Sequence, residues 1–389
     1  MSWSKRYYYH QLRSSSVIPT TFAMSTTQHL ESEPLVKRQK LDGPLIGTHN
    51  GTFHADEALA VYLLRLLPEY ANSPLVRTRD PAILATCHIV VDVGGVHDDT
   101  QKRYDHHQRG FTATFPGRAT KLSSAGLVYM HFGRAILAQL TGLDASSAEI
   151  TVLHEHVYST FVEAIDAADN GLDAYDGAAL AAAGVARRFS DSGFTLGAAV
   201  ARFNRAAPRA AADDDAERRQ RKEDERFARA SVFMGEQFAM EVADKADAWL
   251  PARAPVREAY AQRRRWHPSG RVVVLRDGHV PFASHLYDAE RDEAAREGAP
   301  EDGVRVYYVL FPEDAEENSK WRVRAVTVEG MNFKNRKDLP TAWKGLRDEE
   351  LDKVSGVDGC VFVHANGFIG GNKTFEGALE MAKKAVEME

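Results

Sequence analysis

The segment that most constrains the fold is a short, almost wholly apolar run that ends in a carboxylate. Residues 88–91 lead directly into Asp92 and show no alternation of polar and apolar side chains. A strand of this kind is buried on both faces, which is typical of a parallel sheet covered by helices. Further strand candidates at 45–48 and 75–78 are separated from it by segments with helical spacing of apolar residues. The sequence therefore predicts an α/β domain with a mainly parallel sheet.

The length of the chain implies more than one domain. It has 389 residues, of which 44% are hydrophobic, and a single core rarely grows beyond roughly 250–300 residues. A second, smaller α/β unit is expected from strands near 271–275, 304–311, 321–328 and 360–364 and a final helix from about Thr374. The predicted divisions are a disordered targeting tail at 1–43, the first α/β domain at 44–215, a helical connector at 216–265 and the smaller domain at 266–389.

Composition excludes several classes of protein. No run approaches the roughly 18–20 apolar residues that a membrane span needs, so we expect no membrane partner. The formal net charge of −6 argues against non-specific duplex binding by a broadly basic surface, although it does not exclude nucleic acid as a substrate. Cys87 and Cys360 both lie in apolar runs, which favours neither a disulfide framework nor a cysteine zinc site.

The N-terminal segment has the composition of a targeting sequence. No acidic residue precedes Glu31, and basic, hydroxyl and aromatic residues are frequent before it, which is typical of a mitochondrial transit segment. An untargeted disordered tail is the alternative. Met24 offers an alternative start, and the basic cluster within 34–42 resembles a nuclear localisation signal. We therefore expect a dual location in the mitochondrial matrix and the nucleus.

Histidine and aspartate residues gather in four separate loops of the first domain. Because ligands collect at the carboxyl edge of open α/β sheets, these side chains are expected to meet there. A mixed set of imidazoles and carboxylates suits Mn²⁺, Mg²⁺, Co²⁺ or Fe²⁺. The set exceeds what one ion requires, which favours two ions with Asp92 as the bridge between them. The alternative for any single member is a helix cap or a satisfied polar group. The residues are His49, His54, Asp56, Asp92, Asp105, His106, His107 and Asp169.

The motifs that carry these residues resemble those of a known family. They read H-N-G-x-F-H-A-D-E, V-V-D-V-G, D-H-H-Q-R-G-F and I-D-x-x-D-N-G. They are similar to the DHH phosphoesterase superfamily and, more narrowly, to the MYG (melanocyte proliferating gene 1) family of 3′–5′ RNA exonucleases of mitochondria and nucleus. The resemblance implies an N-terminal DHH-type catalytic domain and a smaller C-terminal substrate-binding domain facing it across a cleft.

The resemblance also implies roles for individual residues. One ion would be held by His49, His54 and Asp92, and the other by Asp56, Asp92, His106 and Asp169. Asp105 would fix the tautomer of a histidine, and His107 would face the substrate phosphate. Asp166, one helical turn before Asp169, remains open as an alternative ligand. Many DHH enzymes have aspartate where His54 stands; the metal expected here is manganese, with magnesium as the alternative.

The C-terminal domain carries a second, glycine-rich signal at 364–374. This segment follows a strand and precedes the last helix, so its backbone N–H groups are expected to form an anion nest. A ligand-free glycine-rich turn is the alternative, and the partial match to a nucleotide-triphosphate loop fails at Asn372. The resemblance implies that His364, Gly370 and Gly371 hold the end of the nucleotide. Arg109 near the metals and Arg336 in the second domain are candidate phosphate contacts.

Together these features predict a metal-dependent 3′–5′ RNA exonuclease in RNA processing, which hydrolyses phosphodiesters with two divalent cations. One alternative is a phosphoesterase of the same fold acting on short oligonucleotides or pyrophosphate. Another is a catalytically inactive scaffold that binds RNA or protein. The 3′–5′ direction rests on the resemblance alone, and the preference for RNA over DNA and the oligomeric state are left open.

Overall fold

The first part of the chain is built on a five-stranded sheet that is parallel except at one edge. The computed structural model describes residues 42–298 and 300–388. The sheet order is β2-β1-β3-β5-β4, and only β4 runs antiparallel to its neighbour. The strands are β1 (Ile46–Thr48), β2 (Leu75–Arg77), β3 (Ile89–Val91), β4 (His97–Asp98) and β5 (Arg103–Tyr104). Ile89, Val90 and Val91 before Asp92 are all buried, as predicted, whereas His88 at the start of the run is exposed.

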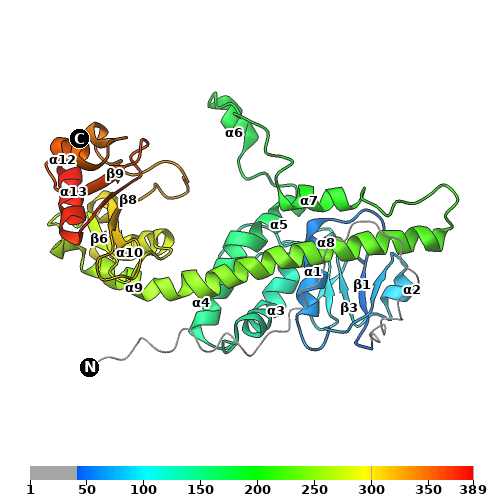
Figure 1. Ribbon diagram of the computed structural model, residues 1–389. Helices are drawn as coiled ribbons and strands as arrows, with labels where there is room; N and C mark the ends of the chain where they lie inside the picture. Colours follow the sequence, from blue (N-terminus) through cyan, green and yellow to red (C-terminus); the bar gives the residue numbers. More distant parts are fainter. Residues whose placement is uncertain (1–41, 299, 389) are drawn as a thin grey trace, which may run out of the picture. The chain divides into compact units, whose positions relative to one another are not determined.

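Most helices of this part lie on one face of the sheet and share a core with it, whereas α2 packs on the other face in a small separate cluster and α6 buries no residue (Figure 1). Residues 148–169 form one helical path interrupted by a π-helical turn at Tyr158–Val162. The largest fully buried side chains of this core include Phe53, Tyr129 and Tyr158. The helices are α1 (Ala55–Arg65), α2 (Pro81–Leu84), α3 (Ser124–Thr141), α4 (Ala148–Val157), α5 (Glu163–Asp169), α6 (Gly177–Ala182) and α7 (Leu196–Phe203).

The start of α3 is tied to the end of α5 by one buried carboxylate. Asp166 accepts hydrogen bonds from the backbone N–H and hydroxyl of Ser123, from the N–H of Gly126 and from the hydroxyl of Tyr158. These bonds satisfy donors that a helix start leaves unpaired. A Cβ at Gly126 would lie 2.2 Å from the Asp166 carboxylate, so the cap requires glycine there.

The long helix α8 (Ala216–Asp244) belongs to the same core. Its apolar face buries Phe227, Met234 and Phe238 among the residues of the first domain. Gly235 permits close approach to α1, since a Cβ there would lie 2.2 Å from the ring of Tyr62. A π-helical turn (Lys245–Trp249) connects α8 to α9 (Leu250–Ala261). Residues 216–261 are thus helical, and α8 completes the packing around α1.

The C-terminal part contains a second five-stranded sheet, which is mixed. Its order is β6-β7-β8-β10-β9, with β6 and β7 parallel and the remaining pairs antiparallel. The strands are β6 (Val272–Val274), β7 (Tyr308–Pro312), β8 (Trp321–Ala325), β9 (Cys360–Val363) and β10 (Ile369–Asn372). The helices are α10 (Ala283–Glu297), α11 (Glu301–Val304), α12 (Asp348–Ser355) and α13 (Phe375–Glu387). The protein is therefore an α/β protein, as predicted.

The expected anion nest at 364–374 is wrong. Gly370 and Gly371 lie within β10, where they pair with both β8 and β9. Their place in the ladder leaves no free row of N–H groups for an anion. The glycines serve packing instead, because a Cβ at Gly371 would lie 2.5 Å from the guanidinium of Arg322. Thr374 caps α13 by accepting a hydrogen bond from Gly377, and the last helix starts where it was predicted.

Two further sequence predictions concern the N-terminal tail and membrane-spanning segments. The tail at 1–43, including Met24, lies almost wholly outside the described residues, so its address signals remain predictions. Among the residues that the structure describes, no helix combines the length and the apolar character needed to cross a membrane.

Candidate metal centre

Parallel pairing of β1 with β3 brings the first two predicted loops together. His49 directly follows β1 and Asp92 directly follows β3, so both side chains start from the same edge of the sheet. The loop after β1 continues into the start of α1, which carries Asp56 and Glu57. The third loop follows β5 and contains His106. The topology therefore gathers these loops at one place, as the sequence predicts.

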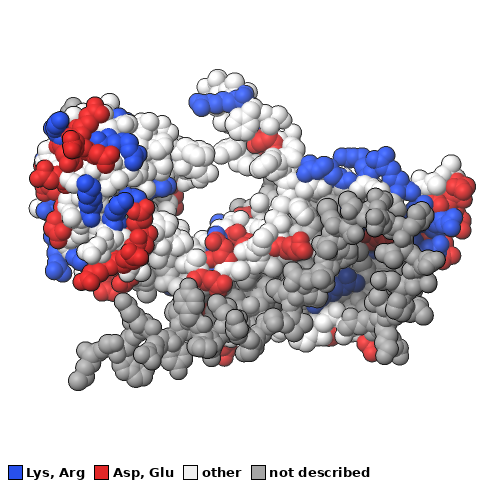
Figure 2. Space-filling model, in the orientation of Figure 1, with Lys and Arg blue, Asp and Glu red and all other residues white. Residues whose placement is uncertain are grey.

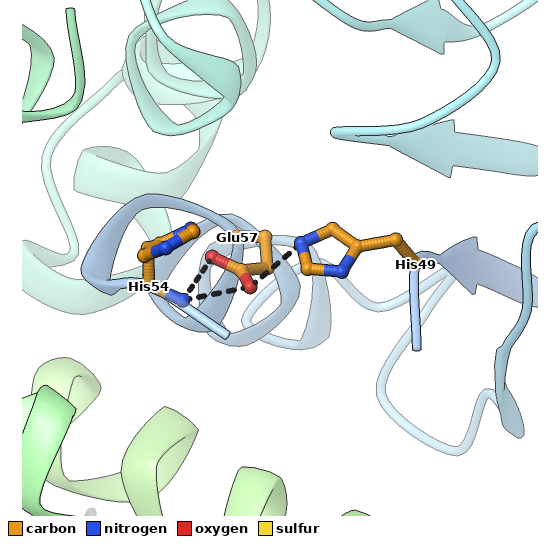
Figure 3. A group of neighbouring side chains, drawn as sticks. All are labelled: His49, His54 and Glu57. Atoms are coloured by element: carbon orange, nitrogen blue, oxygen red, sulfur yellow. Dashed lines mark hydrogen bonds and ion pairs between the residues drawn. The ribbon is translucent and has the colours of Figure 1, made fainter. Parts of the chain in front are cut away.

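The first cluster contains a residue to which the sequence analysis assigned no role. The Nε2 atom of His49 lies 3.3 Å from Asp92 Oδ2 and 3.1 Å from Glu57 Oε1. Glu57 is fully buried, and its carboxylate also accepts hydrogen bonds from the backbone N–H of His54 at 2.9 and 3.0 Å (Figure 3). Its position three residues after the cap of α1 is the signal that was available, since glutamate there forms a capping box.

The second cluster shares Asp92 with the first. Asp92 Oδ1 lies 3.4 Å from His106 Nε2, which in turn lies 2.9 Å from Asp169 Oδ2. Asp56 comes from the start of α1 and accepts a hydrogen bond of 2.7 Å from the hydroxyl of Ser124. Each carboxylate oxygen of Asp92 thus faces a different histidine. This is the arrangement expected of a bridging ligand.

Unsatisfied atoms show that the donor set fits metal ions. Within the described chain, Asp56 Oδ1 is buried without a hydrogen-bond partner, and Asp92 Oδ1 and His106 Nε2 are buried with ion-pair contacts that do not meet hydrogen-bond geometry. Such atoms are rare in native proteins unless something else satisfies them. The carboxylates of Asp56, Glu57 and Asp92 are all buried and offer oxygens within 4.8 Å of one another. Burying like charges so closely is unfavourable without cations, and imidazole with carboxylate suits Mn²⁺ or a similar ion.

The groups that lie within 4.8 Å fall into overlapping sets. Four such sets occur among the described residues, and His54, Asp56, Glu57 and Asp92 each appear in two of them. Overlap of this kind is what two neighbouring ions with shared ligands require. The sets are His49, His54 and Glu57; Asp92, His106 and His107; His54, Asp56 and Asp169; and Asp56, Glu57 and Asp92.

The crowding of charged groups shifts the pKa values of the histidines and aspartates in the site. Burial lowers the pKa of His49, but hydrogen bonds to Asp92 and Glu57 outweigh it and raise the pKa to about 10. His106 likewise loses solvation, yet Asp169 and Asp92 raise its pKa to about 9. Burial raises the pKa of Asp92, whereas His106 and His49 lower it to about 2. Burial and the neighbouring Asp92, Glu57 and Asp169 hold the pKa of Asp56 well above its usual range. The raised pKa values of His49 and His106 thus reflect the carboxylates gathered around them.

The backbone at Asp92 is held in an unusual conformation. Its φ of 56° lies in the left-handed region, which residues with a side chain rarely adopt. Its N–H donates to the carbonyl of Tyr104, which anchors the turn to β5. Such conformations persist where the surrounding structure imposes them, and they concentrate at functional sites. Here the turn directs the carboxylate of Asp92 toward both histidines.

The structure separates the two candidate aspartates on α5. Asp169 lies beside His106, and its side chain is 15% exposed. Asp166 is buried, and its carboxylate is occupied by the donors that cap α3. Asp169 therefore belongs to the cluster around His106, whereas Asp166 stabilises the start of α3.

The predicted histidine-orienting residue contacts His107. Asp105 Oδ1 lies 2.7 Å from His107 Nδ1 and also accepts from the N–H of His107. The other oxygen of Asp105 accepts a hydrogen bond of 2.6 Å from the N–H of Gly95. The side chain of His107 is 60% exposed, so its second ring nitrogen is open to solvent. Arg109 lies two residues further on and is also exposed.

The predicted phosphate contact at Arg336 is not supported. Its guanidinium forms a two-pronged pair with the carboxylate of Glu290, at 2.7 and 2.8 Å, and both side chains are less than 10% exposed. A buried pair of this kind cannot release its arginine without leaving an unpaired carboxylate. His364 is exposed next to Phe368 in the turn between β9 and β10, and Gly370 and Gly371 lie in β10.

Comparison with known proteins identifies relatives over almost the whole described chain. A family model named MYG1_exonuc, described as an uncharacterised protein family (UPF0160), matches residues 45–386. The chain is 45% identical over 362 residues to the human MYG1 exonuclease, which covers 91% of this chain and 89% of that protein. It is 43% identical over 350 residues to MYG1 protein C27H6.8 of Caenorhabditis elegans, covering 88% and 95%. It is 39% identical over 355 residues to MYG1 protein YER156C of Saccharomyces cerevisiae, covering 90% and 99%. The chain belongs to the MYG1 exonuclease family.

Proposed function

We propose that this protein is a metal-dependent exonuclease that removes nucleotides from the 3′ ends of RNA, with two divalent cations, Mn²⁺ or Mg²⁺, in its site. The observation that carries the proposal is the buried cluster in which Asp92 is shared between His49 and His106. Relatives 45% identical to the chain bear the name exonuclease, which supports a nuclease activity. The direction and the preference for RNA rest on the motifs quoted above.

The ligands would divide into two sets that meet at Asp92. His49, His54 and Glu57 would serve one cation, and Asp56, His106 and Asp169 the other. When bound, the cations would supply positive charge at the oxygens of the scissile phosphate. The protein contributes the orientation of these ligands, which helix starts and strand ends hold in place.

His107 is placed to act on the substrate itself. Because Asp105 lies against its Nδ1, a neutral His107 carries its proton on that atom and presents Nε2 to solvent as an acceptor. The exposed Nε2 can therefore accept a proton from the attacking water and pass that proton to the leaving oxygen. We propose His107 as the proton-handling residue and Arg109 as a contact for the phosphate.

A cluster of arginines near the site favours a polynucleotide over a small phosphate ester. Lysine and arginine side chains gather over α7 and the segment that leads from it to α8 (Figure 2). Within the described residues none of these arginines is paired with a carboxylate, and most bond to backbone carbonyls. Asn204, next to one of them, bonds both the N–H and the carbonyl of Phe53 and so ties this region to the metal-site loop. The arginine cluster is Arg202, Arg205, Arg209, Arg226 and Arg229.

The cellular setting is part of the proposal. The transit-like composition before Glu31 and the basic cluster within 34–42 support action in the mitochondrial matrix and the nucleus. Fluorescent fusions that start at Met1 and at Met24 would test this. We expect the shorter form to lose mitochondrial import and keep nuclear entry.

The decisive experiment is a product ladder. Purified protein is incubated with Mn²⁺ and RNA that carries a label at either its 5′ or its 3′ end. We expect the 5′ label to remain on a ladder of shortening fragments and the 3′ label to appear at once in mononucleotides. Asp92→Asn should abolish both patterns while the thermal unfolding of the protein stays cooperative. A folded, metal-loaded protein that cleaves no RNA, or that releases the 5′ label first, would contradict the proposal. Much faster hydrolysis of a dinucleotide or pyrophosphate would favour the smaller substrates.

A further inference from the structure

An apolar cavity adjoins the candidate metal centre. It has a volume of about 470 Å³, and His54, Asp56 and Asp169 of the metal cluster form part of its lining. The rest of the lining is almost entirely apolar, and the cavity therefore joins a charged region to an apolar one. The apolar residues are Phe53, Ala55, Phe161, Ala164, Ile165, Ala168, Leu196 and Ala201.

Three separate segments build the walls. The loop before α1 contributes Phe53, the stretch from the π-helical turn into α5 contributes Phe161 and Ala164, and the start of α7 contributes Leu196. Two hydrogen bonds between Asn204 and the backbone of Phe53, of 3.1 and 2.8 Å, hold α7 against the loop. The walls of the cavity are therefore held in place by contacts between separate segments of the fold.

The few hydroxyl groups of the lining already have partners. Thr160 donates to the carboxylate of Glu241, and Thr195 accepts from the N–H of Ala198 at the start of α7. Away from the metal cluster, the walls thus offer flat and aliphatic surfaces with little capacity to read a pattern of donors and acceptors. A ligand that fits must have one anionic end and one apolar, flat end.

We propose that this cavity holds the nucleobase of the terminal nucleotide while the scissile phosphate lies at the metal cluster. The proposal rests on the nuclease function proposed above and adds a subsite to it. The volume falls within the roughly 300–1,000 Å³ of typical small-ligand sites. Phe161 is the partly exposed phenylalanine of the lining, whereas Phe53 is fully buried in the wall. Contacts between a base and an aromatic side chain tolerate all four bases, because every base has a π face. The cavity therefore binds the terminal base without selecting its identity.

The test compares oligonucleotides that differ only at the terminal residue. We expect kcat/KM to vary little among the four terminal bases and to fall about 5- to 150-fold when the terminal residue is abasic, the range for loss of one stacked base. Ala164→Trp places a large ring in the cavity from an exposed position on α5. This variant should raise KM for the normal substrate at least about fivefold and leave the abasic substrate unaffected. Equal effects on both substrates, or no effect, would overturn the proposal.

Two controls separate this subsite from the proposed function. Ala148→Trp changes an exposed alanine on α4 that does not line the cavity, and it should leave both substrates unaffected. Binding of adenosine monophosphate and of ribose 5-phosphate is measured by calorimetry with Mn²⁺, which requires no cleavage. We expect the nucleotide to bind at least about fivefold more tightly, and Ala164→Trp to remove the difference. Equal affinities would reject the base subsite even if RNA is degraded. A clear difference without cleavage of RNA would instead reject the nuclease.

Discussion

At the scale of single residues, the site depends on carboxylates that each perform one distinct task. Asp92 faces two histidines, Glu57 pairs with His49 and caps α1, and Asp166 caps α3 without approaching the cluster. The amino-acid composition does not distinguish these tasks, because Asp92, Glu57 and Asp166 are all acidic and buried in the same domain. They follow from which donor each oxygen meets, and each can be tested by removing a single charge.

Glu57→Gln should weaken metal binding and leave the fold intact. Glutamine still accepts the hydrogen bond from the N–H of His54, so the cap of α1 survives, but the negative charge beside His49 is lost. We expect the affinity for Mn²⁺ to fall about 10- to 100-fold, as for other groups that support metal ligands. Calorimetric titration measures this, with Glu149→Gln on the exposed start of α4 as the control. Unchanged affinity in Glu57→Gln would remove Glu57 from the centre.

Asn substitutions at the two aspartates of α5 should have opposite effects. Asp169→Asn should reduce kcat/KM by more than about 100-fold, because Asp169 lies with His106, and change the unfolding free energy by less than about 0.5 kcal/mol. Asp166→Asn should cost about 1–3 kcal/mol of unfolding free energy, because it disrupts a fully buried cap. Chemical denaturation and RNA cleavage by the same preparations measure both quantities. If Asp166→Asn instead abolished cleavage and Asp169→Asn instead lowered the unfolding free energy, Asp166 would be the ligand.

At the scale of elements, sequence patterns predicted the strands and helices better than the connections. The glycine-rich run after β9 has the composition of a loop, yet it forms β10, because Arg322 and the backbones of two neighbouring strands pack where side chains would stand. Tertiary contacts overrode the local signal there. The π-helical turn at Tyr158–Val162 between α4 and α5 likewise has no local signal in the apolar spacing of the sequence.

The contact of α4 with the turn after α8 should depend on pH. The ring of His156 stacks on Trp249 with centroids 3.5 Å apart, and burial, aided by Lys245 and His285, lowers the pKa of His156 to about 4. The folded-state pKa lies below the unfolded value of about 6.5, so this stabilisation is present above pH 6.5 and is lost as the pH falls toward 4. We expect a loss of about 1–2 kcal/mol after allowing for partial exposure.

His156→Phe isolates this contribution, because phenylalanine can keep the stack but cannot take up a proton. Unfolding free energies of both proteins are measured between pH 7 and pH 4.5 in the same buffers. The variant should lose less stability over this range than the parent protein does. Parallel curves would show that the charge state of His156 does not matter to the fold.

At the scale of the whole molecule, the distribution of charge matters more than its total. Residues 1–43 hold six basic and three acidic side chains, so the rest of the chain carries a net charge of −9 and is more acidic than the total of −6 suggests. Within that acidic body, Asp56, Glu57 and Asp92 are buried in the candidate metal centre, and arginines that have no carboxylate partner among the described residues gather around α7. Separated charges of this kind suit a protein that binds cations in its interior and a polyanion on its surface.

Removing charge from the arginine cluster should weaken binding of long RNA in particular. In an Asp92→Asn background, which prevents cleavage, Arg205→Gln with Arg209→Gln should make the dependence of log K on log salt shallower by about 1–2 for a 20-nucleotide RNA. Binding of a dinucleotide should change little, because it is too short to extend from the metals to the cluster. Fluorescence anisotropy over a salt series measures both.

The matched control uses arginines of α8 that already have acidic partners. Arg218 and Arg221 pair with Asp214 and Glu217, so Arg218→Gln with Arg221→Gln removes the same charge without opening the cluster. We expect the salt dependence of this variant to match the parent protein. Equal losses in both double variants would indicate a general effect of net charge.

The sequence by itself determined the fold class, the family and most members of the candidate metal set. These features are local: a buried strand shows in its run of apolar residues, and the loop after each strand keeps its histidines and aspartates within a few positions. The tertiary structure alone decided that Glu57 joins His49, that Asp169 rather than Asp166 meets His106, and that Arg336 is held by Glu290. The cavity and the arginine cluster likewise arise only from the tertiary structure. The reason is physical, because these outcomes depend on distances between side chains from different elements, and such distances are set by packing and burial.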